Sequence, residues 1–248
     1  MLELLEAEYP AAAVKEELKA LSTRHLLSNP PVAIAEHVRM LLSLGNSTFV
    51  SRLSHEPEGG YSTFSICTLD TPGLFSMITG VMAANGMNIL GARISTSSNG
   101  KALDVLQVNS PQGFVVTDES RWKRVEEDLR QIIQGRVRVG TLVERRHRPS
   151  LLMEKVKPRF PTVIEIDNEV SDAYTVIDIY THDKVGLLYG ITSTLTELGL
   201  YIGVSKISTK IDQVADTFYV RDIFGHKITS EDKLNEIKGR LLQAIDGE

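Results

Sequence analysis

The feature that most constrains this chain is an internal repeat. An Asp-x-x-Gly-Leu turn followed by an apolar periodic stretch occurs twice, and its glycines, Gly73 and Gly186, lie 113 residues apart. At that offset the matched pairs are Asp70 with Asp183, Leu74 with Leu187, Ile78 with Ile191, Thr79 with Thr192, Gly86 with Gly199 and Ile89 with Ile202. With one residue deleted, Asp104 matches Asp216, Val108 matches Val220 and Gly113 matches Gly225. The repeat predicts an internal duplication, and therefore two units of one architecture.

Each turn predicts a helix N-terminus beside a ligand site. In the first copy, Asp70-Thr71-Pro72-Gly73 follows a strand, and Asn85-Gly86 ends the helix. Asp or Thr suits a helix cap and Pro suits the first turn. Backbone N–H groups at such an end favour an anion, and Gly73 leaves room for a ligand to approach the main chain. The turn therefore favours a small carboxylate ligand over covalent chemistry.

The patterns around the turns predict an α+β fold. In the first unit we expect strands over 48–55, 61–69, 88–96 and 102–109, helices from 72 and from 117, and a last strand over 136–143. Asn99-Gly100 predicts the hairpin turn between two of these strands. In the second unit we expect strands over 162–166 and 174–181, a helix, two strands, and a helix from about 230 to 245. Each unit thus has a β-α-β-β-α-β core, a mostly antiparallel sheet and two helices on one face. Because the second unit lacks a fourth strand, 162–166 takes its place, as 48–55 flanks the first unit.

The remaining stretches set the domain boundaries. We expect a helical segment over 1–45, a first unit over 46–146, a linker over 147–160 and a second unit over 161–248. The helices of the first segment, interrupted at Pro10 and restarted at Asn29-Pro30-Pro31, are too short to bury their own apolar stripe. They either pack on the following unit or form the tail of a preceding helical domain, and we favour the tail. The basic stretch over 136–159 is interpreted as a solvated linker rather than an anionic docking strip.

Composition excludes several classes of protein. The chain of 248 residues has 42% hydrophobic and 24% charged residues, as a soluble globular protein does. Its formal charge of −5 argues against a nucleic-acid partner. No apolar run approaches the roughly 20 residues that cross a membrane, and the N-terminus lacks the features of a signal peptide. The single cysteine, Cys67, cannot form an intrachain disulfide, so we expect a cytoplasmic location.

The two turns, each opening a helix inside a βαββα unit, resemble ACT domains, which are small amino-acid-sensing modules of ferredoxin-like fold. In its details the chain resembles the tandem ACT region at the C-terminus of the bacterial bifunctional PII uridylyltransferase/uridylyl-removing enzymes. The stretches that carry this resemblance are LFSMITGVMAANGMNILGARISTSSNGKALDVLQV, FPTVIEIDNEVSDAYTVIDIYTHDKVGLLYGIT and KISTKIDQVADTFYVRDIFGHKI. Residues 22–44 also resemble the segment that joins the ACT pair to the hydrolytic domain.

The resemblance implies a glutamine sensor that regulates uridylylation and deuridylylation of the PII signal protein. The family's catalytic domains, which use Mg²⁺ and UTP, have no counterpart here, since Gly-Ser with paired aspartates and a metal-binding His set are missing. We therefore expect a regulatory module without catalytic residues, metal or cofactor, acting on catalytic domains in cis or in trans. The candidate ligand-binding residues are Asp70, Thr71, Pro72, Gly73, Leu74, Phe75, Asn88, Ile89, Asp183, Lys184, Gly186, Leu187, Leu188 and Ile202. Because Lys184-Val185 replaces Thr71-Pro72, the two sites need not be equivalent.

Other interpretations compete with this one. His182-Asp183 spells the dyad of metal-dependent HD hydrolases, but the sequence supplies no further His and Asp at suitable spacing. Cys67 is expected to be a core thiol, and Asp104 and Asp216 to be structural hydrogen-bonding groups. Thr79 and Thr192 either pack or line the site. A further alternative is a free-standing ACT protein that forms a homodimer through exposed sheet edges.

Overall fold

The computed structural model describes residues 5, 7–146, 161–210 and 213–247. The helical segment consists of α2 (Ala11–Ala20), α3 (Thr23–Ser28) and α4 (Pro31–Ser43). The first unit consists of β1 (Phe49–Glu56), β2 (Tyr61–Leu69), α5 (Leu74–Ala84), β3 (Asn88–Thr96), β4 (Lys101–Asn109), α6 (Glu119–Ile133) and α7 (Val139–Arg146). The second unit consists of β5 (Val163–Asp167), β6 (Thr175–His182), α8 (Leu187–Glu197), β7 (Tyr201–Lys210), β8 (Gln213–Arg221) and α9 (Glu231–Asp246).

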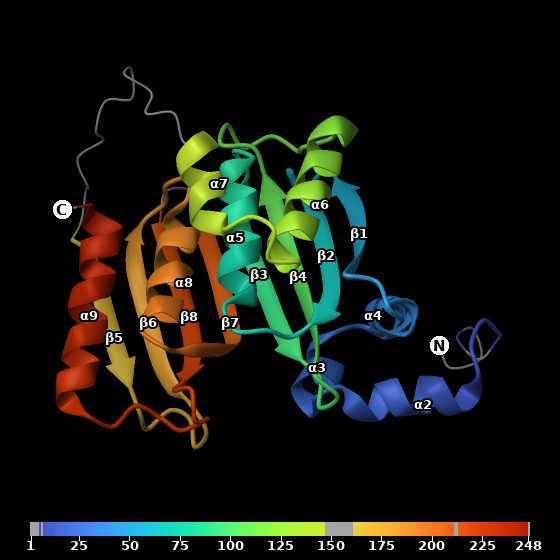
Figure 1. Cartoon of the computed structure of the whole chain (residues 1–248), viewed down its shortest axis with the longest axis horizontal. Coiled ribbons are helices and arrows are strands. Elements are labelled where there is room, and N and C mark those ends of the chain that lie inside the picture. Colours follow the sequence, from blue (N-terminus) through green and yellow to red (C-terminus); the bar gives the residue numbers. More distant parts are fainter. Residues whose placement is uncertain (1–4, 6, 147–160, 211–212, 248) are drawn as a thin grey trace.

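The described strands form a single eight-stranded antiparallel sheet in the order β1-β2-β4-β3-β7-β8-β6-β5 (Figure 1). The order of the second half mirrors that of the first, so a pseudo-two-fold axis passes between β3 and β7. At this seam Gly91 lies opposite Ser208, and Arg93 lies opposite Lys206. The predicted α+β class is confirmed, and the two flanking strands, β1 and β5, lie at the outer edges of the sheet as expected.

The prediction of a strand over 136–143 is wrong, because 139–143 belong to α7 and 136–138 form the bend before it. Val139 and Leu142, three positions apart on one helical face, pack against the main core. Arg146 at the end of α7 holds the buried Asp128 through two hydrogen bonds, of 2.5 and 2.9 Å. A further strand has no free edge beside β3, since β7 already pairs there. The predicted linker, 147–160, lies outside the described residues.

One apolar core runs through both units beneath the helices. Helices α5, α6, α8 and α9 cover the same face of the sheet (Figure 1). The predicted apolar face of α5 is buried, with Ile78 and Val81 fully so, and Ile191 of α8 lies in the same cluster. Because this cluster includes residues from both units, the duplication produces one shared core rather than two separate ones.

The helical segment covers the opposite face of the first unit. Ile66 and Cys67 are successive residues of β2, so their side chains leave opposite faces of the sheet. Ile66 joins the main core, whereas Cys67 joins a second cluster with Val38 and Leu41 of α4. The helices therefore pack on the following unit, and the interpretation of this segment as the tail of a preceding helical domain stays a prediction.

The turn between β3 and β4 fastens this segment to the sheet. Ser98 N–H donates to the Ala20 carbonyl at 2.9 Å. The Lys101 ammonium contacts the Glu17 carboxylate at 2.5 Å and the Leu41 carbonyl at 3.1 Å. On its other side, the same turn accepts a hydrogen bond of 2.9 Å from Asp70 N–H at the Gly100 carbonyl. Among the described residues, no helix has the length and apolar character needed to span a membrane.

Candidate functional site: two matched pockets at the seam

The two Asp-x-x-Gly-Leu turns lie at the seam between the units, and each begins a helix with a glycine. Gly73 is the residue before α5 and Gly186 the residue before α8, with φ of 76° and 85°. Glycine adopts this left-handed conformation without the steric cost of a Cβ. Neither helix start has a capping side chain. The expected cap by Asp or Thr is therefore wrong, because Asp70 instead binds side chains of the neighbouring strands.

Each helix start presents backbone donors. Leu74 N–H bonds the Thr71 carbonyl at 3.0 Å, and Met77 N–H bonds the Gly73 carbonyl at 2.9 Å. The N–H groups of Phe75 and Ser76, which lie between them, have no carbonyl one turn earlier within the helix. The second copy repeats this with Leu187 N–H to Lys184 at 3.0 Å and Gly190 N–H to Gly186 at 2.9 Å. Both turns therefore offer the anion-binding end predicted from the sequence.

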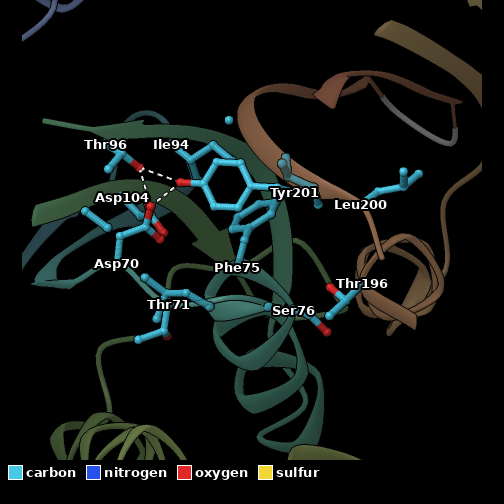
Figure 2. Close-up of a pocket in the computed structure, with 15 residues that line it drawn as sticks. Asp70, Thr71, Phe75, Ser76, Ile94, Thr96, Asp104, Thr196, Leu200 and Tyr201 are labelled. Carbon is cyan, nitrogen blue, oxygen red and sulfur yellow. Dashed lines mark hydrogen bonds between the residues drawn. The ribbon is translucent and has the colours of Figure 1, made fainter. Parts of the chain in front are cut away.

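The first pocket, here called the Asp70 pocket, combines the first turn with the start of β7 from the other unit (Figure 2). Thr96 Oγ1 donates to Asp70 Oδ2 at 2.9 Å, and the Tyr201 hydroxyl donates to the same oxygen. The two hydroxyl oxygens are 3.1 Å apart. Figure 2 shows the Tyr201 ring beside the ring of Phe75. The remaining lining residues are Thr71, Gly73, Leu74, Ser76, Ile94, Ala102, Asp104, Thr196, Leu200, Ile202 and Gly203.

The second pocket, here called the Asp183 pocket, has the same construction with the units exchanged. Asn88, the first residue of β3, donates from Nδ2 to Asp183 Oδ2 at 3.0 Å. Asn88 and Tyr201 are 113 residues apart, so they occupy the same position in the two copies. The remaining lining residues are Thr79, Ala83, Met87, Ile89, Lys184, Gly186, Leu187, Leu188, Tyr189, Ile207, Val214 and Asp216.

A second aspartate lies in each pocket, and neither of these aspartates is among the candidate ligand-binding residues predicted from the sequence. Asp104 lines the Asp70 pocket and Asp216 lines the Asp183 pocket, each with 3% of its surface exposed. Burial raises the pKa of Asp104, and the nearby Asp70 raises it further. Burial also raises the pKa of Asp216 to about 7, although the Ser208 N–H at 3.1 Å opposes the shift. The recurrence of Asp104 and Asp216 at matched positions of the two copies was the sequence signal that could have identified them. A buried acid is rare unless it has a partner.

The structure gathers the candidate residues into these two places. All of them line one pocket or the other except Pro72. Asp183 itself is partly buried, and this burial raises its pKa. Thr79 and Thr192, which could either pack or line the site, pack against each other. Their buried hydroxyls hydrogen-bond at 2.9 Å across the helix interface. Thr79 also lines the Asp183 pocket. The ligand-binding roles of all these candidate residues remain predictions.

The other residues singled out in the sequence are His182, Asp183 and Cys67. His182 ends β6, and its neighbour Asp183 belongs to the second pocket. Within the residues that the structure describes, no group of three or more His, Cys, Asp and Glu side chains gathers as a metal site would. Cys67 is buried, and burial raises its pKa to about 12, which leaves a neutral thiol at physiological pH.

Comparisons with known proteins agree with this architecture. The family model described as ACR9-like, ACT-like domain matches residues 163–246, which is the second unit. The bifunctional uridylyltransferase/uridylyl-removing enzyme of Rhodospirillum rubrum is 34% identical over 96% of this chain and 26% of its own length. That of Cereibacter sphaeroides is 33% identical over 98% of this chain and 26% of its own length. The chain is homologous to part of these enzymes.

The match to these uridylyltransferase relatives is confined to part of each relative. The chain spans about a quarter of the length of the two relatives above. The Azospirillum brasilense enzyme of the same description is 37% identical over 73% of this chain and 19% of its own length. Among solved structures, aspartate kinase from Synechocystis matches with a TM-score of 0.40 and 15% identity over 75% of this chain and 27% of that chain. Homology to the ACT region of uridylyltransferase relatives supports a regulatory module.

Proposed function

We propose that this chain is the amino-acid-sensing module of a uridylyltransferase/uridylyl-removing enzyme, and that its ligand is glutamine. One observation carries the proposal. Each pocket combines the N-terminal end of a helix with a pair of aspartates, Asp70 with Asp104 and Asp183 with Asp216. An α-amino acid carries an anion and a cation on neighbouring atoms, and such a pocket offers a partner for each.

The chemistry of the pocket favours a neutral side chain on the ligand. The α-carboxylate suits the backbone N–H groups at the helix start, and the ammonium suits the aspartate pair. Glutamate would bring a second negative charge towards Asp70 or Asp183, whereas glutamine brings an amide. A site that hydrogen-bonds this amide discriminates against ligands that leave buried polar groups unpaired.

The position at the seam suits a regulatory role. A ligand in either pocket touches both units, since the turn comes from one unit and the strand start from the other. A ligand that binds one arrangement of the units better than another shifts the population towards it. The catalytic domains, in cis or in trans, would respond to this shift and act on the PII protein. Mg²⁺ and UTP belong to those domains, and the cytoplasm is the compartment we infer.

Isothermal titration calorimetry of the chain with glutamine tests this function. We expect saturable heat with glutamine and at least tenfold weaker binding of glutamate. Glutamine should also raise the melting temperature, because a ligand at a hundredfold excess over Kd stabilises its protein by about 2.7 kcal/mol. Asp70→Asn combined with Asp183→Asn keeps the side-chain shapes while removing both charges, and should abolish the heat. Equal heat from glutamine in this variant and in the wild type would refute the proposed site.

A further inference from the structure

The two pockets are built from matching turns and strands but differ in the side chains that fill them. The free volume is about 30 Å³ in the Asp70 pocket and about 20 Å³ in the Asp183 pocket. Such a volume holds about one water molecule. An amino acid therefore enters either pocket only when a lining side chain moves aside. The pocket whose side chains move more readily will take the ligand first.

In the Asp70 pocket the carboxylate already has strong partners. Asp70 Oδ2 accepts from both Tyr201 and Thr96, so two hydroxyl groups stand where a ligand ammonium would bind. Tyr201 is partly buried, and its ring lies beside Phe75 (Figure 2). Opening this pocket requires that the ring leave its packing and that both hydrogen bonds be exchanged.

In the Asp183 pocket the equivalent position holds Asn88, whose amide donates one hydrogen bond to Asp183. The carboxamide is shorter than a phenol ring and rotates about a single terminal bond. Its oxygen also accepts hydrogen bonds, so Asn88 can turn from bonding Asp183 to bonding a ligand ammonium. The same side chain that closes this pocket can therefore contribute to binding.

The space beside the glycine of each turn also differs between the two pockets, and it is larger in the Asp183 pocket. A Cβ atom at Gly73 would lie 2.9 Å from the Thr196 methyl group, so that methyl already fills the space beside the turn. A Cβ atom at Gly186 would lie 3.9 Å from Ala83, which occupies the position equivalent to Thr196. The Asp183 pocket therefore leaves more room beside its glycine.

We propose that the Asp183 pocket is the amino-acid site of this chain, and that Tyr201, supported by Thr196, keeps the Asp70 pocket closed. The inference rests on the proposed function. It makes Asn88 and Tyr201 the residues that decide which copy of the repeated turn binds ligand.

Exchange of the differing residues between the pockets tests this assignment. Tyr201→Asn with Thr196→Ala gives the Asp70 pocket the residues of its counterpart, and Asn88→Tyr with Ala83→Thr does the reverse. Calorimetry with glutamine should give one site in the wild type and two in the first variant. The second variant should lose at least tenfold in affinity. Asp183→Asn replaces the second variant if that chain fails to fold by circular dichroism, and should lose affinity to the same extent.

The outcomes separate this inference from the proposed function. Two equal sites in the wild type would overturn the inference while leaving glutamine sensing intact. The same holds for wild-type affinity in the second variant, or for binding that appears only after Tyr201→Asn with Thr196→Ala. Absence of heat in the wild type and in both exchange variants at millimolar glutamine would overturn the proposed function itself.

Discussion

Thr79 and Thr192 hydrogen-bond each other at 2.9 Å across the interface of α5 and α8, although 113 residues separate them. They are the same residue of the repeated sequence, so their contact marks the pseudo-two-fold axis. Each hydroxyl also lies within hydrogen-bonding distance of a carbonyl of its own helix, Ser76 at 3.1 Å and Leu188 at 2.8 Å. The pair thus joins the two units at a buried point.

Removal of this pair should show coupling between the two threonines. Thr79→Val or Thr192→Val should each lower the free energy of unfolding by about 1 to 2 kcal/mol, since a buried polar partner is lost. The double variant should cost less than the sum, because two apolar groups then face each other. A double-mutant cycle by urea denaturation measures this. Additive losses would contradict an interaction between the two hydroxyls.

Gly80 is expected to be intolerant of any side chain. A Cβ atom there would lie 2.3 Å from a Val139 methyl group and 2.8 Å from the Tyr189 ring, so α7 and α8 approach the bare backbone of α5. Gly80→Ala should destabilise the chain by about 1 to 3 kcal/mol. Gly190→Ala is the matched control in α8, because its Cβ meets nothing closer than 3.8 Å. The control should gain about 0.5 to 1 kcal/mol from helix propensity, as measured by thermal unfolding.

Asp216 should reduce stability at neutral pH. Its folded pKa of about 7 lies above the ordinary value of 3.8, so the folded chain holds this proton more tightly than the unfolded chain. Stability from this group is present at low pH and is lost as the pH rises towards 7. Relative to the wild type, Asp216→Asn should gain up to about 4 kcal/mol between pH 4 and pH 8. Urea titrations at both pH values measure the gain, and an unchanged difference would refute the shift.

The same aspartate should couple ligand binding to protons. A ligand ammonium near Asp216 favours the ionised carboxylate, so binding below pH 7 should release a proton. The affinity for glutamine should therefore rise from pH 5.5 to pH 7.5 and then level off. Calorimetry in buffers of different ionisation enthalpy counts the released protons, and Asp216→Asn should remove the effect. Proton uptake on binding would contradict this role.

The buried pair His25 and His37 predicts a loss of stability in mild acid. The His25 Nε2 and His37 Nδ1 atoms lie 3.0 Å apart between α3 and α4. Burial, with His25 and Arg93 nearby, lowers the pKa of His37 to about 4 from its ordinary 6.5. As the pH falls from 6.5 to 4, the unfolded state gains a proton first, so stability falls by up to about 3 kcal/mol. His37→Asn should show a flatter dependence over this window in denaturant titrations, and an equally steep dependence would refute it.

The duplicated frame could be predicted from sequence because it depends on local patterns. The turns, the Asn99-Gly100 hairpin and the apolar face of α5 each have a signature within a short window. The strand predicted over 136–143 failed because Val137 and Val139 alternate with arginines, while the contacts that decide for a helix come from α5 and α8. Such contacts are distant in sequence and leave no local signal.

Part of the lining of the two pockets could be predicted from the sequence. The pocket-lining residues of the two turns could be predicted because glycine and aspartate at fixed spacing have a clear local meaning. Tyr201 was not predicted because it reaches the Asp70 pocket from β7 of the other unit, which pairs with β3 across the seam. Asp104 was not predicted because its position in a strand of its own unit favoured a structural role. Only the sheet order, with β3 beside β7, brings Tyr201 to Asp70. The repeat alone does not reveal that each pocket is shared between units.

The turn between β3 and β4 has a mechanical consequence. Its Gly100 carbonyl accepts from Asp70 N–H, and its Ser98 N–H donates to the Ala20 carbonyl. The turn that begins at Asp70, on one face of the sheet, and the helical segment on the other face are therefore hydrogen-bonded to the same short loop. A backbone shift at Asp70 either breaks a hydrogen bond or pulls this loop with it, and the loop in turn pulls the end of α2. The loop between β3 and β4 therefore couples the position of the Asp70 pocket to the position of the helical segment on the opposite face of the sheet.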